Sequence, residues 1–251
     1  MKIAVLISGH MRNYSSCLEN QYTHLFNLNA GKEKNNLDIF IYTSYTDSLK
    51  HKKGNPKINS IRGLQVFEQN SDFEHKLRSS YSSYLKEIYI ENEKIGEEKQ
   101  YSYEDVEHWH WHRNNQFRKL YECFKMMKNY SQNNNIKYDA IIRCRPDIVF
   151  QTKPIVVRKH IKSDNEIFCF GGWDVPKTVM SHKLAFFDGF SFGSYNSMKR
   201  YCSAFLRENP EQGPFTPENQ VVLHLKEGNI DIKYLNKSRQ KRLGKEYEIK
   251  R

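Results

Sequence analysis

The chain begins with five apolar residues in succession, Ile3 to Ile7. An unbroken apolar run of this kind is typical of a strand that is covered on both faces of a parallel sheet. Leu18, Tyr22 and Leu25 follow at helical spacing, and Asp38 to Thr43 reads as a second strand. A strand, a helix and another strand in this order predict an α/β fold, in which a mainly parallel central sheet is flanked by helices.

Similar patterns continue along the chain, and no internal repeat is visible. Apolar residues at helical spacing predict helices over 73–88, 106–124 and 195–206, and a further helix that Thr216 and Pro217 open and Gly228 closes. Strands are predicted over 138–144, 166–170 and 186–192. We expect one domain over residues 1–236, more irregular in its second half, and a basic tail over 237–251.

Charge and cysteine content narrow the classes of partner and compartment. The 251 residues include 40 Lys and Arg against 29 Asp and Glu, a formal net charge of +11. This charge favours phosphates, nucleic acids, anionic lipid headgroups or nucleotide-linked substrates, and it does not choose between them. The five cysteines are scattered singly, which indicates neither a disulfide framework nor a cysteine zinc site and predicts a reducing compartment. No apolar run approaches the roughly 18 residues of a membrane span.

The strongest candidate for chemistry is the segment Tyr138 to Phe150, which contains Arg143, Arg145 and Asp147. Because side chains alternate along a strand, we expect these three residues on one face, near the end of the strand. Ligands of α/β sheets bind outside the carboxyl ends of the strands, where two guanidinium groups and a carboxylate suit a pyrophosphate and a divalent cation. A structural ion-pair cluster is the alternative for the same residues.

The segment Ser8-Gly9-His10-Met11-Arg12 is expected between the first strand and its helix. Backbone N–H groups at such a junction favour an anion, and a glycine permits close approach of a ligand. A plain strand-turn-helix connection is the alternative, because one glycine is far less specific than a G-x-G-x-x-G fingerprint.

Histidine and tryptophan alternate from His108 to His112. On a helix, the first and last of these histidines are four residues apart and have the spacing to share a zinc ion. No third ligand is evident, so an aromatic cluster on a helix face or in an acceptor groove is favoured over a metal site. The tryptophan rings suit stacking on sugars and, equally, packing in a core.

Five segments of the chain carry a resemblance to a known family. They are Met1 to Arg12, Asp38 to Thr43, Gln116 to Leu120, Tyr138 to Phe150 and Asp188 to Gly193. The first contains ISG-x-x-R, and the fourth contains the specific element R-x-RPD-x-x-F. In this order they resemble glycosyltransferases of the GT-A fold, most closely small enzymes encoded by bacterial surface-polysaccharide clusters and by large DNA viruses.

The resemblance implies a GT-A-like (Rossmann-like) sheet and a nucleotide-sugar-dependent glycosyltransferase. Such an enzyme moves a hexosyl or pentosyl unit from a nucleotide-diphosphate sugar donor to a hydroxyl of a glycan acceptor. The resemblance further implies a nucleotide-sugar-binding half over residues 1–150, an acceptor-side half over 151–236, and Mn²⁺ or Mg²⁺ as cofactor. The expected location is the cytoplasm of a bacterium, or of a host cell if the protein is viral.

The resemblance also assigns roles to residues of this chain. Asp147 takes the place of the last aspartate of the Asp-x-Asp pair that holds the metal in GT-A enzymes. No two aspartates of this chain lie two positions apart, so Asp147 acts alone, with Arg145 supplying charge that a metal otherwise delivers. The residues expected to bind the nucleotide sugar or order its loop are Ser8, Gly9, His10, Arg12, Gln116, Arg143 and Arg145.

Two acids are candidates for the catalytic base that deprotonates the acceptor. Asp188 lies between apolar residues and a glycine-bearing turn, and Glu218 lies in the first turn of its expected helix. Each has a structural alternative, because the helix dipole alone favours Glu218 and Asp188 also suits bracing a turn. A base of this kind is needed only if the reaction inverts the anomeric centre.

Two other classes of function stay open. A nucleic-acid-binding protein agrees with the net charge, but the charge is dispersed and no RNA or DNA motif is present, so no nucleic acid is expected. A sugar-binding protein without activity agrees with the missing Asp-x-Asp. The stretch 237–251 carries seven basic and two acidic residues and suits either a solvated tail or contact with an anionic membrane.

Overall fold

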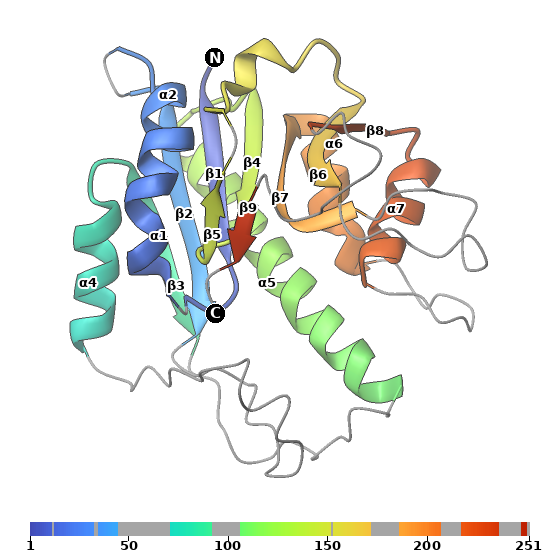
Figure 1. Cartoon of the computed structure of the whole chain (residues 1–251), viewed down its shortest axis with the longest axis horizontal. Coiled ribbons are helices and arrows are strands. Elements are labelled where there is room, and N and C mark those ends of the chain that lie inside the picture. The colour runs from blue at the N-terminus through green and yellow to red at the C-terminus, as the bar shows by residue number, and fades with distance from the viewer. Residues whose placement is uncertain are drawn as a thin grey trace.

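A seven-stranded sheet lies at the centre of the protein, here a computed structural model (Figure 1). The structure describes residues 1–11, 13–32, 35–44, 71–91, 106–151, 153–171, 186–206, 217–235 and 247–249. The strands are Ile3–Ser8 (β1), Leu37–Ser44 (β2), Leu85–Glu91 (β3), Ala140–Cys144 (β4), Ile148–Phe150 (β5), Glu166–Gly171 (β6), Phe186–Ser194 (β7), Asp231–Tyr234 (β8) and Tyr247–Ile249 (β9). The α-helices are Tyr14–Gln21 (α1), Asn27–Asn29 (α2), Ser71–Tyr81 (α4), Val106–Asn133 (α5), Tyr195–Cys202 (α6) and Pro217–Glu227 (α7). A π-helical turn at Tyr22–Phe26 joins α1 to α2, and 3₁₀ turns lie at Val157–Lys159 and Ser203–Leu206.

The strand order is β3-β2-β1-β4-β7-β6-β8, and β5 and β9 form a separate antiparallel pair. The first four strands of this order are parallel, and β7 runs antiparallel to its neighbours β4 and β6. The outermost strand, β8, is parallel to β6. The predicted α/β fold class, with a mainly parallel central sheet flanked by helices, is confirmed.

Helices cover both faces of the sheet, and this explains the unbroken apolar run of β1. Ile3, Val5 and Ile7 pack in the core layer beneath α1 and α4. Ala4 and Leu6 pack in the opposite layer beneath α5, α6 and α7. Burying a side chain such as Ile7 stabilises the fold by about 1.5 to 3 kcal/mol, so both faces of this strand contribute to stability.

The chain changes sides of the sheet between β1 and β4. The connection from β1 to β2 places α1 on one face, whereas the connection from β3 to β4 places α5 on the other. β4 lies beside β1, on the side away from β2, so the connections leave these two strands in opposite directions. Such a switch point, at the carboxyl ends of the strands, is where open α/β sheets bind ligands. In Figure 1 these ends lie at the bottom, where α5 extends past the edge of the sheet.

One sequence prediction of secondary structure was wrong. The helix expected over 73–88 ends at Tyr81, and Leu85–Glu91 forms the edge strand β3. The backbone of this strand pairs with β2, and its side chains Ile88 and Ile90 pack in the same core layer as α4. In the expected basic tail, Tyr247–Ile249 forms β9 and pairs with β5. The remaining tail residues lie outside the described part of the chain.

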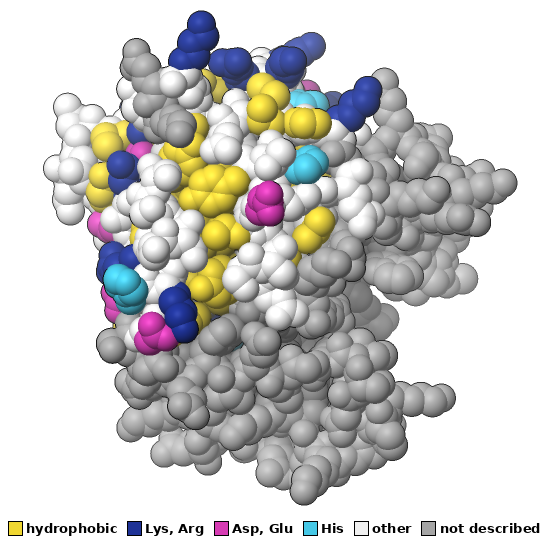
Figure 2. Space-filling model, turned by 60° about the vertical axis from the view of Figure 1, so that its left-hand side comes forward, with side chains coloured by type: hydrophobic (Ala, Val, Ile, Leu, Met, Phe, Trp, Pro, Cys, Tyr) yellow, Lys and Arg dark blue, Asp and Glu magenta, His cyan; other side chains and the backbone are white. Residues whose placement is uncertain are grey.

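None of the five cysteines, which are all buried, forms a disulfide. Among the described helices, none is long and apolar enough to cross a membrane. On the face that Figure 2 shows, Lys and Arg side chains gather along the upper edge, at the amino ends of the parallel strands. The net charge alone therefore does not mark the switch point.

Candidate functional site

The loop after β1 begins at the switch point. Gly9 has a φ of +107°, and its backbone N–H donates a hydrogen bond to the carbonyl of Tyr42 on β2 (3.1 Å). No atom of the described residues lies within 4 Å of the position that a Cβ would take at Gly9. The hydroxyl of Ser8 is buried and has no hydrogen-bond partner. The loop therefore combines an open approach to the backbone with an unsatisfied buried hydroxyl. Arg12 lies outside the described residues.

Arg143 lies near the end of β4, paired with Leu6 of β1 on one side and Ser191 of β7 on the other. Its side chain is only 2% exposed, and it is the largest of the fully buried side chains. Nη1 donates to the adjacent carbonyl of Cys144 (2.8 Å), and Nε has no hydrogen-bond partner. Within the described part of the chain, no carboxylate pairs with this guanidinium, so a full positive charge is buried without a counter-ion.

Side-chain alternation along β4 shows which layer Arg143 occupies. Ile141, two residues earlier on the strand, packs in the layer beneath α5 and α6, so Arg143 lies on the same face. Its charge acts on thiols of both helices: burial raises the pKa of Cys123 on α5 and of Cys202 on α6, and the positive charge of Arg143 opposes both rises.

Three buried polar groups without partners lie on neighbouring strands. Ser8 Oγ, Arg143 Nε and Ser191 Oγ come from β1, β4 and β7, and side-chain alternation places all three residues on the α5 side of the sheet. An unsatisfied buried polar group costs about 1 to 3 kcal/mol, and more if it is charged. The site therefore holds one cation and two hydroxyls that a bound anion would satisfy.

The other buried charges of the described residues have partners. The carboxylate of Asp38 accepts hydrogen bonds from Lys2 (2.9 Å) and Tyr138 (2.8 Å) at the opposite end of the sheet. Lys119 Nζ donates to Ser44 Oγ (2.8 Å). Arg143 is thus the exception among them, which separates it from an ordinary structural ion pair.

Asp147 and Arg145 form such a pair in the turn between β4 and β5. Nε and Nη2 of Arg145 each donate to a different carboxylate oxygen of Asp147, both at 2.8 Å, and Asp147 is completely buried. The strand ends at Cys144, so the alternation that the sequence predicted does not extend through 145–147. Arg143 points toward α5, whereas Arg145 folds back onto Asp147.

Helix α1 holds this turn in place from the other side. The buried side-chain amide nitrogen of Gln21 donates to the carbonyls of Arg145 (3.2 Å), Pro146 (3.0 Å) and Ile148 (3.0 Å). Asn20 donates to the carbonyl of Phe150 (3.0 Å) and accepts from its N–H (2.7 Å). The RPD turn is therefore a rigid part of the fold.

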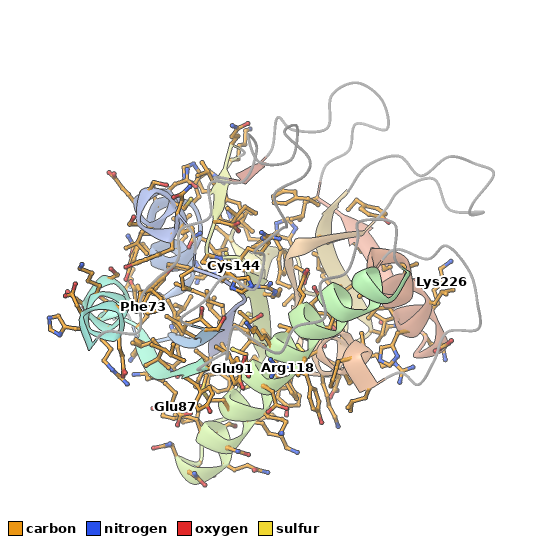
Figure 3. All side chains as sticks on the ribbon, turned by 90° about the horizontal axis from the view of Figure 1, so that it is seen from below. Phe73, Glu87, Glu91, Arg118, Cys144 and Lys226 are labelled. Atoms are coloured by element: carbon orange, nitrogen blue, oxygen red, sulfur yellow. The ribbon has the colours of Figure 1, made fainter. Side chains whose placement is uncertain are left out.

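A second polar cluster joins α5 to the ends of β2 and β3. Both nitrogens of the Arg118 fork donate to the carboxylate of Glu91 (2.6 and 2.8 Å), and Tyr42 OH donates to the same carboxylate (2.8 Å). Figure 3, which looks onto this end of the molecule, shows Glu91 and Arg118 side by side. Burial raises the pKa of Glu91, but the hydrogen bonds from Arg118 and Tyr42 and the charges of Arg118 and Lys119 outweigh it and lower the pKa overall.

This cluster reaches the loop after β1 through Ser44. Lys119 lies 3.8 Å from Glu91 Oε2 and donates to Ser44, whose hydroxyl is 3.4 Å from His10 Nδ1. Gln116, three residues before Lys119 on α5, is half-buried. The structure thus brings His10 and the α5 residues to the same end of the sheet as Ser8 and Arg143.

The carboxylate of Asp147, the expected metal ligand, already has a partner. Each of its oxygens accepts a hydrogen bond from Arg145, so a cation bound there would share the carboxylate with that guanidinium. No group of three or more His, Cys, Asp or Glu side chains is arranged to hold a metal ion in the described part of the chain. The absence of such a group there does not test the expected site, in which Asp147 is the one carboxylate ligand, and the assignment of Mn²⁺ or Mg²⁺ to Asp147 stays a prediction.

The two candidate bases stay predictions. Asp188 lies in β7 and Glu218 in the first turn of α7, and the positions of their side chains are outside what the structure describes. The same holds for the side chains of His108 to His112 within α5.

Sequence reasoning missed three residues of this site. Ser191 shares the α5 face of the sheet with Arg143, Lys119 adds a buried cation, and Gln21 fixes the turn. Only Lys119 carried a signal, because a lysine is unexpected on the apolar face of a helix between Phe117 and Leu120. Ser191 and Gln21 are ordinary residues until the strand register and the turn are known.

Comparison with known proteins gives no family. No family model matches the chain, and no curated protein matches it. Among solved structures it is similar to a nucleoside-diphosphate-sugar pyrophosphorylase from Vibrio cholerae RC9, with a TM-score of 0.42 and 11% identity over 92% of this chain and 90% of that one. A likeness at this level carries no inference about activity. The function proposed below therefore rests on the residues at the switch point.

Proposed function

We propose that the protein is a glycosyltransferase that uses a nucleotide-diphosphate sugar as donor and a glycan hydroxyl as acceptor. The observation that carries this proposal is the buried guanidinium of Arg143, which has no acid partner among the described residues and lies at the switch point between β1 and β4. A buried cation of this kind needs an anion, and a diphosphate supplies one.

The loop after β1 supports a nucleotide as the carrier of that anion. Gly9 leaves open space beside the backbone, and Ser8 offers a buried hydroxyl that lacks a partner. His10 lies close to Ser44 at the neighbouring strand end. We assign the diphosphate to the region of Ser8 and Arg143, and the remainder of the nucleotide to the loop beyond them.

The reaction requires little from the protein beyond positioning and charge. The acceptor oxygen forms a bond to the anomeric carbon of the donor sugar, and the bond from that carbon to the diphosphate oxygen breaks. The electron pair leaves with the diphosphate, where Arg143 stabilises the developing charge. In an inverting reaction the acceptor proton passes to Asp188 or Glu218, and a retaining reaction uses neither in that role.

The acceptor site and a contact with a membrane are also proposed. The glycan acceptor is assigned to the half formed by residues 151–236, and a contact between the basic stretch 237–251 and an anionic membrane stays a prediction. No step of this reaction is routed through a metal ion, and Mn²⁺ or Mg²⁺ at Asp147 stays a prediction.

A thermal-shift screen of nucleotide sugars tests the donor. A donor at 100 times its dissociation constant stabilises a protein by about 2.7 kcal/mol, which corresponds to about 5 to 10 °C in the melting temperature of a chain of this size. The donor that gives the largest shift is then incubated with glycan acceptors, and release of the nucleoside diphosphate is measured. Absence of any shift across UDP-, GDP-, ADP- and dTDP-linked sugars would contradict the proposal.

The same screen separates the nucleic-acid alternative. Binding of oligonucleotides that weakens steeply with salt, in a protein that ignores nucleotide sugars, would favour that class. The variant Arg158→Met is a matched control, because Arg158 is an exposed arginine in the 3₁₀ turn Val157–Lys159, which is remote from the carboxyl end of β4 in Figure 1.

A further inference from the structure

The hydrogen bonds of the Asp147 carboxylate bear on whether a metal ion or the chain's own cations neutralise the charge of a bound diphosphate. Its two oxygens each accept a hydrogen bond from Arg145 at 2.8 Å, and the residue is completely buried. A divalent cation on this carboxylate would lie beside the guanidinium of Arg145, and two positive charges at that distance repel each other.

The same end of the sheet has an excess of positive charge supplied by the chain. The described charged side chains there are four cations and two carboxylates, a net charge of +2: Arg118, Lys119, Arg143 and Arg145 against Glu91 and Asp147. Each of the two carboxylates is already engaged by an arginine fork. Lys119 also lies 3.8 Å from the carboxylate of Glu91, so among these described cations it is Arg143 that has no carboxylate partner.

The unsatisfied donors point to where an anion would sit. Arg143 Nε, Ser8 Oγ and Ser191 Oγ are all buried, and each belongs to a residue at most 2% exposed. Strand register places Ser191 directly opposite Arg143, with Ser8 two residues beyond Leu6, the partner of Arg143 on β1. One guanidinium and two hydroxyls form a donor set for phosphoryl oxygens and offer no carboxylate oxygen to a cation.

We propose that these three residues form a metal-independent anion subsite, which binds the diphosphate of the nucleotide sugar in place of a divalent cation. This inference rests on the proposed function for the identity of the anion. During transfer the diphosphate takes the electron pair of the broken bond, and the guanidinium and hydroxyls donate hydrogen bonds to it without losing a proton. Asp147 holds Arg145 and does not ligate a metal.

Titration calorimetry with inorganic pyrophosphate, UDP and GDP tests the subsite in two media, one containing EDTA and one containing Mn²⁺ or Mg²⁺. We expect the affinity of the probe that binds best to differ by less than about threefold between the media, which is less than 0.7 kcal/mol. Binding that appears only with a divalent cation would overturn the metal-independent subsite and leave the proposed function standing.

Substitutions assign the binding to these residues. Arg143→Met is expected to weaken binding by about 10- to 100-fold in EDTA, since hydrogen bonds to charged groups contribute about 1.5 to 3 kcal/mol. Arg143→Lys, which keeps the charge and loses the fork, provides a second variant. Ser191→Ala is expected to weaken binding less, and Ser83→Ala, an exposed serine, serves as its control. Unchanged affinity in Arg143→Met would overturn the subsite.

The probes separate this inference from the function on which it rests. Pyrophosphate binding in EDTA without binding of any nucleotide or nucleotide sugar would support the anion subsite and contradict the proposed glycosyltransferase. Nucleotide-sugar binding and transfer that require a metal would support the function and overturn the subsite. Binding of all of these probes in EDTA, lost in Arg143→Met and kept in Arg158→Met, supports both.

Discussion

Replacing Arg143 by Met should make the protein without ligand more stable, although it removes the largest fully buried side chain of the sheet. Burying a guanidinium costs several kcal/mol, and here no carboxylate among the described residues offsets that cost. Methionine has a similar length and carries no charge. The substitution loses one hydrogen bond, to the Cys144 carbonyl, which contributes about 0.5 to 1.5 kcal/mol.

The expected balance is a gain of about 1 to 3 kcal/mol in the free energy of unfolding, which corresponds to about 2 to 10 °C in the melting temperature. Differential scanning calorimetry without ligand, supported by urea unfolding, measures it. Arg118→Met is the matched contrast. It removes the fork that binds Glu91 and should lower stability by about 1 to 2 kcal/mol, a value reduced by the partial exposure of Arg118.

A fall in the melting temperature of Arg143→Met similar to that of Arg118→Met would refute the reasoning. It would mean that the guanidinium stabilises the fold itself and is no more available to a ligand than Arg118 is. If Arg143→Met stabilises the protein without ligand and also weakens pyrophosphate binding, only a binding role for Arg143 explains both results. The arginine then lowers the stability of the fold and contributes to binding.

Four further predictions follow from single residues. Gly9→Ala should lower the free energy of unfolding by about 1 to 3 kcal/mol in urea titrations, because a φ of +107° is strained for any other residue even though space is open, and unchanged stability would contradict the backbone geometry. Gln21→Leu should remove the hydrogen bonds to the RPD turn and lower both the melting temperature and the affinity for donor, whereas loss of neither would make that turn self-supporting. The lowered pKa of Glu91 means that its contribution to stability is present above its unfolded value near 4.5 and is lost as the pH falls through the lower folded value, so Glu91→Gln should flatten acid unfolding curves measured below about pH 5. If the reaction inverts, Asp188→Asn should lower turnover about 10²- to 10⁴-fold at saturating donor while Glu218→Gln does much less, and the reverse pattern would transfer the role of base to Glu218.

The fold was predictable where a pattern had a single physical cause. The apolar run of β1 requires helices on both faces, and Pro217 and Gly228 agree with the start and end of α7, whereas Thr216 lies outside the described residues. The strand β3 was not predictable, because its apolar residues also fit a continuation of the helix before it. Only pairing with β2 separates the two, and that pairing is not local in sequence.

The site was predictable in part, for a related reason. Strand alternation correctly placed Arg143 near the end of β4, but the strand ends at Cys144, and the turn pairs Arg145 with Asp147. A difference of one or two residues in where the strand ends therefore changed which side chains lie together. Ser191 became part of the site only through the antiparallel register of β7 against β4, which no local pattern encodes.

A crystal structure with bound nucleoside diphosphate would show whether the diphosphate lies at Arg143. UDP or GDP is used, whichever binds more tightly in EDTA. We predict diphosphate oxygens within hydrogen-bond distance, about 2.7 to 3.2 Å, of Arg143 and of at least one of Ser8 and Ser191. A diphosphate farther than about 6 Å from Arg143, beyond the reach of one bridging water, would contradict the assignment of the donor site to the switch point between β1 and β4.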